Sequence, residues 1–207
     1  MDTIEQTIEH YLDNTLPHTG LRNFTVEHMA ADLRMSKKTI YERYSSKREL
    51  IGTFIRNKVD KLQGELERKI GAETDPVRQL TVIFFTAQHI IIPFFVAMGN
   101  DVKKMYPEIW QEIENRRMAI ISVYAATFEQ IQKNGYVHSD ISPDAFAAML
   151  RILIQAFFQA ENILTQRVSF IELSTGLFKT LLRGIFLPEH YEKFDSVLDE
   201  MQKSLPY

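Results

Sequence analysis

The hydrophobic pattern of the chain is helical over most of its length. Between residues 2 and 16, isoleucine and leucine recur every four positions. Steps of three and four residues place apolar side chains on one face of an α-helix. The same spacing recurs in the segments 25–33, 47–70, 76–98, 107–133, 143–164, 169–186 and 188–201. Residues 136–141 alternate weakly, but a lone short strand has nothing to pair with, so we interpret them as a connector. The pattern predicts an all-α protein.

Proline, glycine and capping residues divide this pattern into separate helices. Pro17 and Gly20 are expected to end the first helix. Residues 71–76 break the long helix 47–70, and Asp75 is expected to cap the helix that follows. The helix 47–70 is therefore the expected mechanical link between a small N-terminal part and a larger C-terminal part.

The most apolar run, residues 82–98, predicts a buried helix at the centre of a bundle. Its 17 residues fall short of the roughly 20 that span a membrane, and Gln88, His89 and Pro93 interrupt it. Because proline lacks an N–H and clashes with the preceding turn, we expect a kink near residues 87–89. No membrane partner is expected.

Two later helices carry more apolar residues than one packed face can use. These are the segments 143–164 and 169–186, the second opened by a capping box at Ser169 and Glu172. The surplus predicts a second buried face, and the simplest account is a symmetric homodimer in which both helices of each chain form a four-helix bundle.

Two short helices separated by a tight turn lie between residues 25 and 47. Thr25 and Ser36 can cap them, and the spacing of Ser46 and Glu49 predicts a capping box at the next helix. Facing outward from the second helix are Lys37, Lys38, Thr39, Tyr41 and Arg43, whereas Ile40 and Tyr44 are expected to face inward. A helix–turn–helix of this kind can place its second helix in the DNA major groove, although on spacing alone it can equally be plain scaffold.

Charge favours the DNA-binding interpretation. Residues 22–69 contain 12 Lys or Arg and 7 Asp or Glu, whereas the whole chain has a net charge of −3. Residues 1–21 contain 4 acidic residues and no Lys or Arg. Concentrated positive charge is what contacts with DNA phosphates require, because each neutralised phosphate releases condensed counterions.

The residues of this region resemble a known family. The runs GLRNFTVEHMA from Gly20 and MSKKTIYERYSSKREL from Met35 are similar to the N-terminal signature of TetR-family transcriptional regulators. The resemblance implies contacts to DNA bases or backbone by Lys37, Lys38, Thr39 and Tyr41, and to phosphate or backbone by Thr25, Arg43 and Lys47. Arg34 departs from the family, which commonly has glycine in this turn. Since a left-handed residue other than glycine costs roughly 1 kcal/mol, either the turn differs slightly or a phosphate contact of the arginine offsets the strain.

Catalytic and metal-binding patterns give no positive signal. The six histidines show no pair at three- or four-residue spacing, and there is no cysteine, so no metal site is expected. The adjacent residues His138, Ser139 and Asp140 cannot align as a catalytic triad. No glycine-rich phosphate loop is present. We therefore expect no enzyme activity and no cofactor. The N-terminus does not read as a secretory signal, so a cytoplasmic protein is expected.

Together these observations predict a ligand-responsive transcriptional regulator, a repressor released from a palindromic DNA operator by an apolar or amphipathic small molecule. Its expected parts are an N-terminal three-helix helix-turn-helix domain (1–47), a linking helix (47–70), and a helical-bundle domain for effector binding and dimerisation (71–207). Candidate effector-binding residues are Phe84, His89, Met105, Trp110, Tyr124, Phe128 and Phe157, each of which can also be ordinary core. The alternative is a helical small-molecule-binding or scaffold protein in which the helix-turn-helix is only structural.

Overall fold

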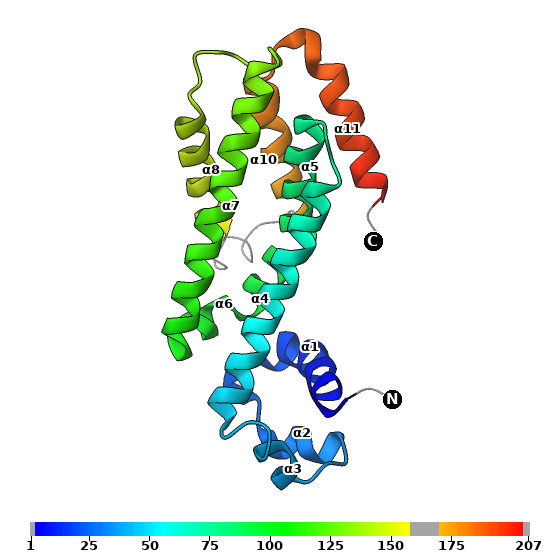
Figure 1. The fold of residues 1–207 in the computed structure, drawn as a ribbon, viewed down its shortest axis with the longest axis vertical. Coiled ribbons are helices and arrows are strands. Elements are labelled where there is room, and N and C mark those ends of the chain that lie inside the picture. Colours follow the sequence, from blue (N-terminus) through cyan, green and yellow to red (C-terminus); the bar gives the residue numbers. More distant parts are fainter. Residues whose placement is uncertain (1–2, 158–169, 205–207) are drawn as a thin grey trace. The chain divides into compact units, whose positions relative to one another are not determined.

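The computed structural model describes residues 3–157 and 170–204, apart from the side chains of residues 90–96, 157, 170 and 204. The helices, shown in Figure 1, are α1 (Ile4–Asn23), α2 (Val26–Asp32), α3 (Lys37–Tyr41), α4 (Lys47–Gly71), α5 (Pro76–Thr86), the π-helical turn η1 (Ala87–Ile91), α6 (Ile92–Met105), α7 (Pro107–Lys133), α8 (Pro143–Phe157), α10 (Phe170–Ile185), the 3-10 turn η2 (Pro188–His190) and α11 (Tyr191–Ser204). The all-α prediction is confirmed.

The chain divides into two compact units. The N-terminal unit comprises Met1–Gln63 and Phe94–Glu114, and the C-terminal unit comprises Gly64–Pro93 and Asn115–Tyr207. Both α4 and α7 therefore contribute residues to each unit. The division into functional domains at residues 47 and 71 stays a prediction.

In the N-terminal unit, α1 buries an apolar stripe. Thr3 and Gln6 form a capping box at its start, and Ile8, Leu12 and Leu16 are buried. The prediction that Pro17 ends this helix is wrong. Pro17 is exposed and lies one turn before the break at Gly20, so its missing N–H removes a hydrogen bond only from the last turn. Gly20 does break the helix, with φ 70° and ψ 163°.

The helix of the apolar run is irregular at the place where a kink was predicted. Between α5 and α6 the chain makes one π-helical turn at Ala87–Ile91, two residues before Pro93. A wider turn accommodates the missing N–H and the ring of a proline. Beyond the apolar run, α6 continues as far as Met105. No helix among the described residues is both long and apolar enough to cross a membrane.

Stacked aromatic rings form much of the core of the C-terminal unit. The ring centroids of Phe128 and Phe146 lie 4.3 Å apart, and those of Phe84 and Phe178 lie 3.6 Å apart. Helix α11 packs along α5, as Figure 1 shows. Met118 of α7 is exposed and takes no part in this core.

The connector 136–141 is not a strand of a sheet, but its backbone is partly paired. Val137 forms an isolated antiparallel bridge with Phe186. The N–H of His138 donates to the carbonyl of Ile185 at 2.9 Å, and the N–H of Leu187 donates to the carbonyl of Tyr136 at 2.9 Å. The expectation that this segment finds nothing to pair with is therefore wrong, because its partner follows α10 nearly fifty residues later. The predicted capping residue Ser169 and residues 158–164 lie outside the described residues.

Candidate nucleic-acid interface and effector cavity

Local capping builds the helix pair α2–α3. The Thr25 hydroxyl accepts a hydrogen bond from the N–H of His28 at 3.2 Å, and the Ser36 hydroxyl accepts one from the N–H of Thr39 at 3.0 Å. Both predicted N-caps are confirmed. With only five residues, α3 is far too short to be stable alone, so it depends on its cap and its packing.

One buried side chain holds α3 against the rest of the unit. Ile40 is fully buried, whereas Tyr41 is 41% exposed and Lys37 and Lys38 lie open to solvent. Tyr44, predicted to be core, follows the helix and is half-buried. Helix α3 therefore presents a polar and aromatic face of the kind that a groove-reading helix requires.

The cations of this face already have acidic partners. Lys37 donates to Glu27 at 2.7 Å, Lys38 lies 3.9 Å from Glu42, and Arg43 pairs with Glu5. Hydrogen bonding to Lys37 lowers the pKa of Glu27, and the same contact raises the pKa of Lys37. Each pair is exposed and therefore weak, so a DNA phosphate can replace the carboxylate at little cost.

Lys47, at the start of α4, is engaged inside the protein. Its ammonium group donates to the carbonyl oxygens of Leu21 (3.2 Å) and Phe24, and lies 5.5 Å from the centre of the Phe24 ring. These contacts tie α4 to the chain that leads into α2. Lys47 is therefore a positioning residue in this structure, and its DNA contact stays a prediction.

The capping box predicted at the start of α4 is half correct. The N–H of Glu49 donates to the Ser46 hydroxyl at 3.1 Å, as expected. The Glu49 carboxylate, however, accepts from the N–H of Ser45 at 2.6 Å and from the Ser45 hydroxyl, one residue before the predicted partner. These hydrogen bonds lower the pKa of Glu49 and fix the loop that joins α3 to α4.

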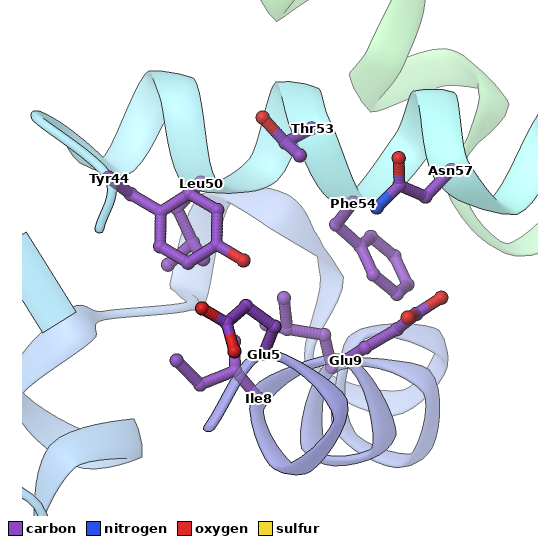
Figure 2. Close-up of a pocket in the computed structure, with 9 residues that line it drawn as sticks. Glu5, Ile8, Glu9, Tyr44, Leu50, Thr53, Phe54 and Asn57 are labelled. Carbon is purple, nitrogen blue, oxygen red and sulfur yellow. The ribbon is translucent and has the colours of Figure 1, made fainter. Parts of the chain in front are cut away.

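A small cavity lies between α1 and α4, beside the loop that joins α3 to α4. Figure 2 shows Glu5, Ile8 and Glu9 of α1 facing Tyr44 and the first turns of α4. The cavity volume is about 30 Å³, which holds roughly one water molecule, so it is no effector site. Glu5 reaches Arg43 at this edge, and burial raises the pKa of Tyr44.

Arg34 keeps the left-handed conformation that the turn between α2 and α3 requires. Its φ is 53°, and no other residue except glycine has a positive φ in the described part of the chain. The N–H of Arg34 donates to the Ala31 carbonyl at 3.1 Å, and that of Met35 to the Ala30 carbonyl at 2.9 Å. The turn is thus hydrogen-bonded around a strained arginine.

The C-terminal unit contains an apolar cavity of about 50 Å³. It is lined by Phe84, Ala87, Tyr124, Leu150, Leu153, Ile154, Ser174, Leu177, Phe178 and Leu181. Only Phe84 and Tyr124 were among the candidate effector-binding residues. The Tyr124 side chain is 3% exposed, burial raises its pKa, and its hydroxyl forms no hydrogen bond with the residues that the structure describes. No charged side chain lines the cavity.

The other candidate effector-binding residues whose side chains are described do not line this cavity. Phe128 is fully buried against Phe146. His89 is half-buried, with Nδ1 3.1 Å from the carbonyl of Phe85. Met105 and Trp110 belong to the N-terminal unit. The side chain of Phe157 lies outside the described residues. Of the seven candidate residues, the structure therefore brings Phe84 and Tyr124 together in one cavity.

No protein-family model matches the chain, and no curated protein matches its sequence. Solved structures do match. A TetR transcription regulator from Haloarcula marismortui is 13% identical, with a TM-score of 0.72 over 88% of this chain and 98% of that chain. A transcriptional regulator of the TetR/AcrR family from Thermobifida fusca is 17% identical, with a TM-score of 0.67 over 87% and 97%. The ketosteroid transcriptional regulator KstR2 of Mycobacterium tuberculosis is 14% identical, with a TM-score of 0.62 over 90% and 97%. The chain has the TetR fold. The resemblance seen in residues 20–50 is thus confirmed at the level of the fold.

Within this TetR fold, Gln88 is a polar feature that the sequence interpretation left aside. It lies in η1, is 1% exposed, and its Nε2 donates toward Ser174 Oγ (2.5 Å), Thr175 Oγ1 (2.8 Å) and the Ile171 carbonyl (3.0 Å). Its Oε1 is buried without a hydrogen-bond partner. The signal was visible as a glutamine inside the most apolar run. Ser174, which contacts Gln88, also lines the cavity.

Among residues 3–157 and 170–204, the TetR fold of this chain brings no three His, Asp or Glu side chains together as a group that could hold a metal ion.

Proposed function

We propose that the protein is a homodimeric, sequence-specific DNA-binding transcriptional regulator. The observation that carries this proposal is the face of α3, where exposed Lys37, Lys38 and Tyr41 surround the single buried anchor Ile40. A helix with one buried residue and an exposed polar face contributes little to a core. It is suited to enter the major groove, where lysine reads guanine and backbone phosphates fix the register.

Thr25, Thr39, Arg43 and Lys47 complete the proposed interface. Thr25 and Arg43 would contact phosphates, and Thr39 would lie beside the bases. Lys47 would add a contact to the DNA backbone. Its ammonium group has three N–H donors, so one can point to a phosphate while another keeps its hydrogen bond to the Leu21 carbonyl.

The proposed dimer uses α8 and α10. Large apolar side chains on these helices remain exposed in the single chain: Ile152 is 65%, Ile171 is 48% and Leu177 is 38% exposed. A symmetric pairing that covers them would place two copies of α3 on one DNA duplex, and two-fold symmetry then makes the operator a palindrome.

The proposed effector is a neutral, apolar or amphipathic small molecule, and the proposed response is release of a repressor from its operator. The cavity that includes Phe84 and Tyr124 supports an apolar ligand. Because no charged side chain lines it, a buried ligand charge would have no partner, which costs several kcal/mol. A ligand must widen the cavity to enter, and α4, which runs on from the start of the DNA-binding region into the C-terminal unit, is the proposed route of coupling.

Selection from random duplex DNA at near-physiological salt tests the proposal. We expect a palindrome to be enriched, with half-sites about one helical turn apart or slightly more. If binding stays no tighter than roughly 10⁻⁴ to 10⁻⁶ M and is indifferent to sequence, the helix-turn-helix is only structural. The protein would then be the alternative, a small-molecule-binding or scaffold protein.

A further inference from the structure

The turn between α2 and α3 holds a strained residue that its own packing does not explain. Arg34 has a φ of 53°, a conformation that costs an L-residue with a Cβ roughly 1 kcal/mol and that glycine adopts freely. The Arg34 side chain is exposed, so no buried contact in the folded chain requires an arginine here. Strained backbone of this kind clusters at functional sites, which makes this arginine a candidate for a role outside the fold.

Arg34 also differs from the other lysines and arginines of residues 3–63 in having no hydrogen-bond or ion-pair partner among the residues that the structure describes. The remaining nine each contact a carboxylate or a backbone carbonyl. The carboxylate pairs are Arg22–Asp101, Lys37–Glu27, Lys38–Glu42, Arg43–Glu5, Arg48–Glu108, Arg56–Glu112, Lys58–Asp13 and Lys61–Glu9. Lys47 contacts two carbonyls instead. Within this described stretch, Arg34 is therefore the cation that can bind an anion without first leaving a partner.

The place of Arg34 in the chain indicates which kind of anion it can bind. Arg34 lies two residues before Ser36, the cap of α3, and three residues before Lys37. Arg34 thus lies in the turn that leads from the end of α2 into α3. When α3 lies in a DNA groove, the groups next to such a turn are backbone phosphates.

We propose that Arg34 is a phosphate anchor that the protein holds ready in the free state, at the expense of strain in the turn. This inference rests on the proposed DNA-binding function and adds a contact at a turn position that glycine would fill more easily. Because the contact is to phosphate, it strengthens binding to every sequence by the same factor and carries no base preference.

A structural explanation competes with this proposal. Arg34 follows the C-terminal end of α2, where a positive charge interacts favourably with the helix dipole. In that case the arginine stabilises the folded chain and contributes nothing at DNA. The two explanations predict opposite changes in stability and different changes in salt dependence, so one set of variants separates them.

The experiment measures binding of the full chain to its selected operator and to a scrambled duplex over a range of salt concentrations. Arg34→Asn removes the charge and tolerates the left-handed conformation, and Arg34→Lys keeps the charge. We expect Arg34→Asn to weaken binding to both duplexes by about tenfold near 0.1 M salt. The slope of log K against log salt should fall in magnitude by about one. Arg34→Lys should keep the slope of the wild-type protein.

Arg68→Asn is the matched control, because it removes an exposed arginine from the far end of α4. It should leave the slope unchanged. A thermal melt of Arg34→Asn and Arg34→Gly should show no loss of stability, since both variants relieve the strain.

An unchanged slope in Arg34→Asn would overturn the inference, as would an equal loss in the Arg68→Asn control. A lower melting temperature together with an unchanged slope would assign Arg34 to the helix end. If the wild-type protein enriches no DNA sequence at all, the proposed function fails instead, and the two failures are thus distinguishable.

Discussion

Lys37 is paired within the free chain and is also one of the proposed DNA contacts. In the free chain its ammonium group is held by Glu27 at 2.7 Å. We predict that Lys37→Ala lowers the magnitude of the salt slope of operator binding by about one, because one phosphate contact is lost. Lys37→Arg is the control and should keep the slope. Tyr41→Ala, by contrast, should change the preferred operator sequence, and repeating the selection would reveal it. A slope that is the same for Lys37→Ala and wild type would remove Lys37 from the interface.

Asp75 gives a prediction of pH-dependent stability. It caps α5 through the N–H of Val77 at 2.8 Å and pairs with Lys193 at 2.7 Å. Burial acts to raise the pKa of Asp75, but the hydrogen bonds from Lys193 and Val77 outweigh it, so the pKa lies below the ordinary value of 3.8. A lowered pKa means that the ionised carboxylate stabilises the folded state above about pH 3.8, and that this stabilisation is lost as the pH falls through the lowered value.

Asp75→Asn keeps a capping oxygen but loses the charge. We expect it to lower the free energy of unfolding by about 0.5 to 1 kcal/mol at pH 7, and the difference from wild type should shrink below about pH 3.8 and disappear as the pH falls through the lowered pKa. Chemical denaturation between pH 2 and 7 measures this. Asp199→Asn, an exposed carboxylate on α11, should show a much smaller difference. A constant difference across this pH range would show that the charge of Asp75 is not responsible.

Single-residue features divide into those that the sequence could reveal and those that it could not. The caps Thr25, Ser36 and Asp75 were predictable, because a cap and its amide are two or three residues apart. The contact between Gln88 and Ser174 joins residues 86 positions apart, so no local pattern could indicate it.

At the scale of elements, α3 is the shortest helix of the proposed DNA interface. Its five residues depend on the Ser36 cap, so we predict that Ser36→Ala destabilises α3 by about 1 kcal/mol and weakens operator binding. Amide hydrogen exchange of Thr39 and Ile40 should become faster while exchange in α4 stays unchanged. Ser36→Thr, which keeps a capping hydroxyl, is the control. Equal exchange rates in Ser36→Ala and wild type would mean that Ile40 packing alone holds the helix.

Breaks in the helices were predictable where a proline or glycine allows only one backbone arrangement. The π-turn before Pro93 lies at the expected place, since the missing N–H must be accommodated within the preceding turn. The prediction for Pro17 failed because a proline on the exposed side of the last helical turn destabilises the helix only slightly. The apolar cavity of the C-terminal unit escaped prediction for another reason. The apolar surplus of the segment 169–186 was assigned to the dimer face, yet Leu177, Phe178 and Leu181 of α10 line the cavity.

At the scale of the whole molecule, the proposed dimer face gives a direct test. We predict that Ile152→Asp makes the protein monomeric at micromolar concentration and reduces operator affinity, because a charge in a buried apolar interface has no partner. Light scattering after size-exclusion chromatography measures the oligomeric state. Val123→Asp changes an exposed apolar residue of α7 and should stay dimeric. A dimeric Ile152→Asp protein would exclude this face.

Effector response is the second prediction for the whole molecule. A neutral apolar compound that raises the melting temperature should change operator affinity by roughly 5- to 150-fold, the usual range of coupling between two sites. Ala87→Phe, which fills the cavity, should abolish the response and leave operator binding in the absence of compound intact. Equal operator affinity with and without a bound compound would show that the two sites are not coupled.

The bridge between Val137 and Phe186 has a consequence for folding kinetics. It closes a loop of nearly fifty residues that contains α8 and α10. Contacts so distant in sequence carry a large closure entropy and tend to form late, after the local helices. The amide protons of His138 and Leu187, which donate the two hydrogen bonds at this bridge, should therefore be among the last in the C-terminal unit to gain protection during refolding. Their protection would report when the contact between Val137 and Phe186 forms during folding.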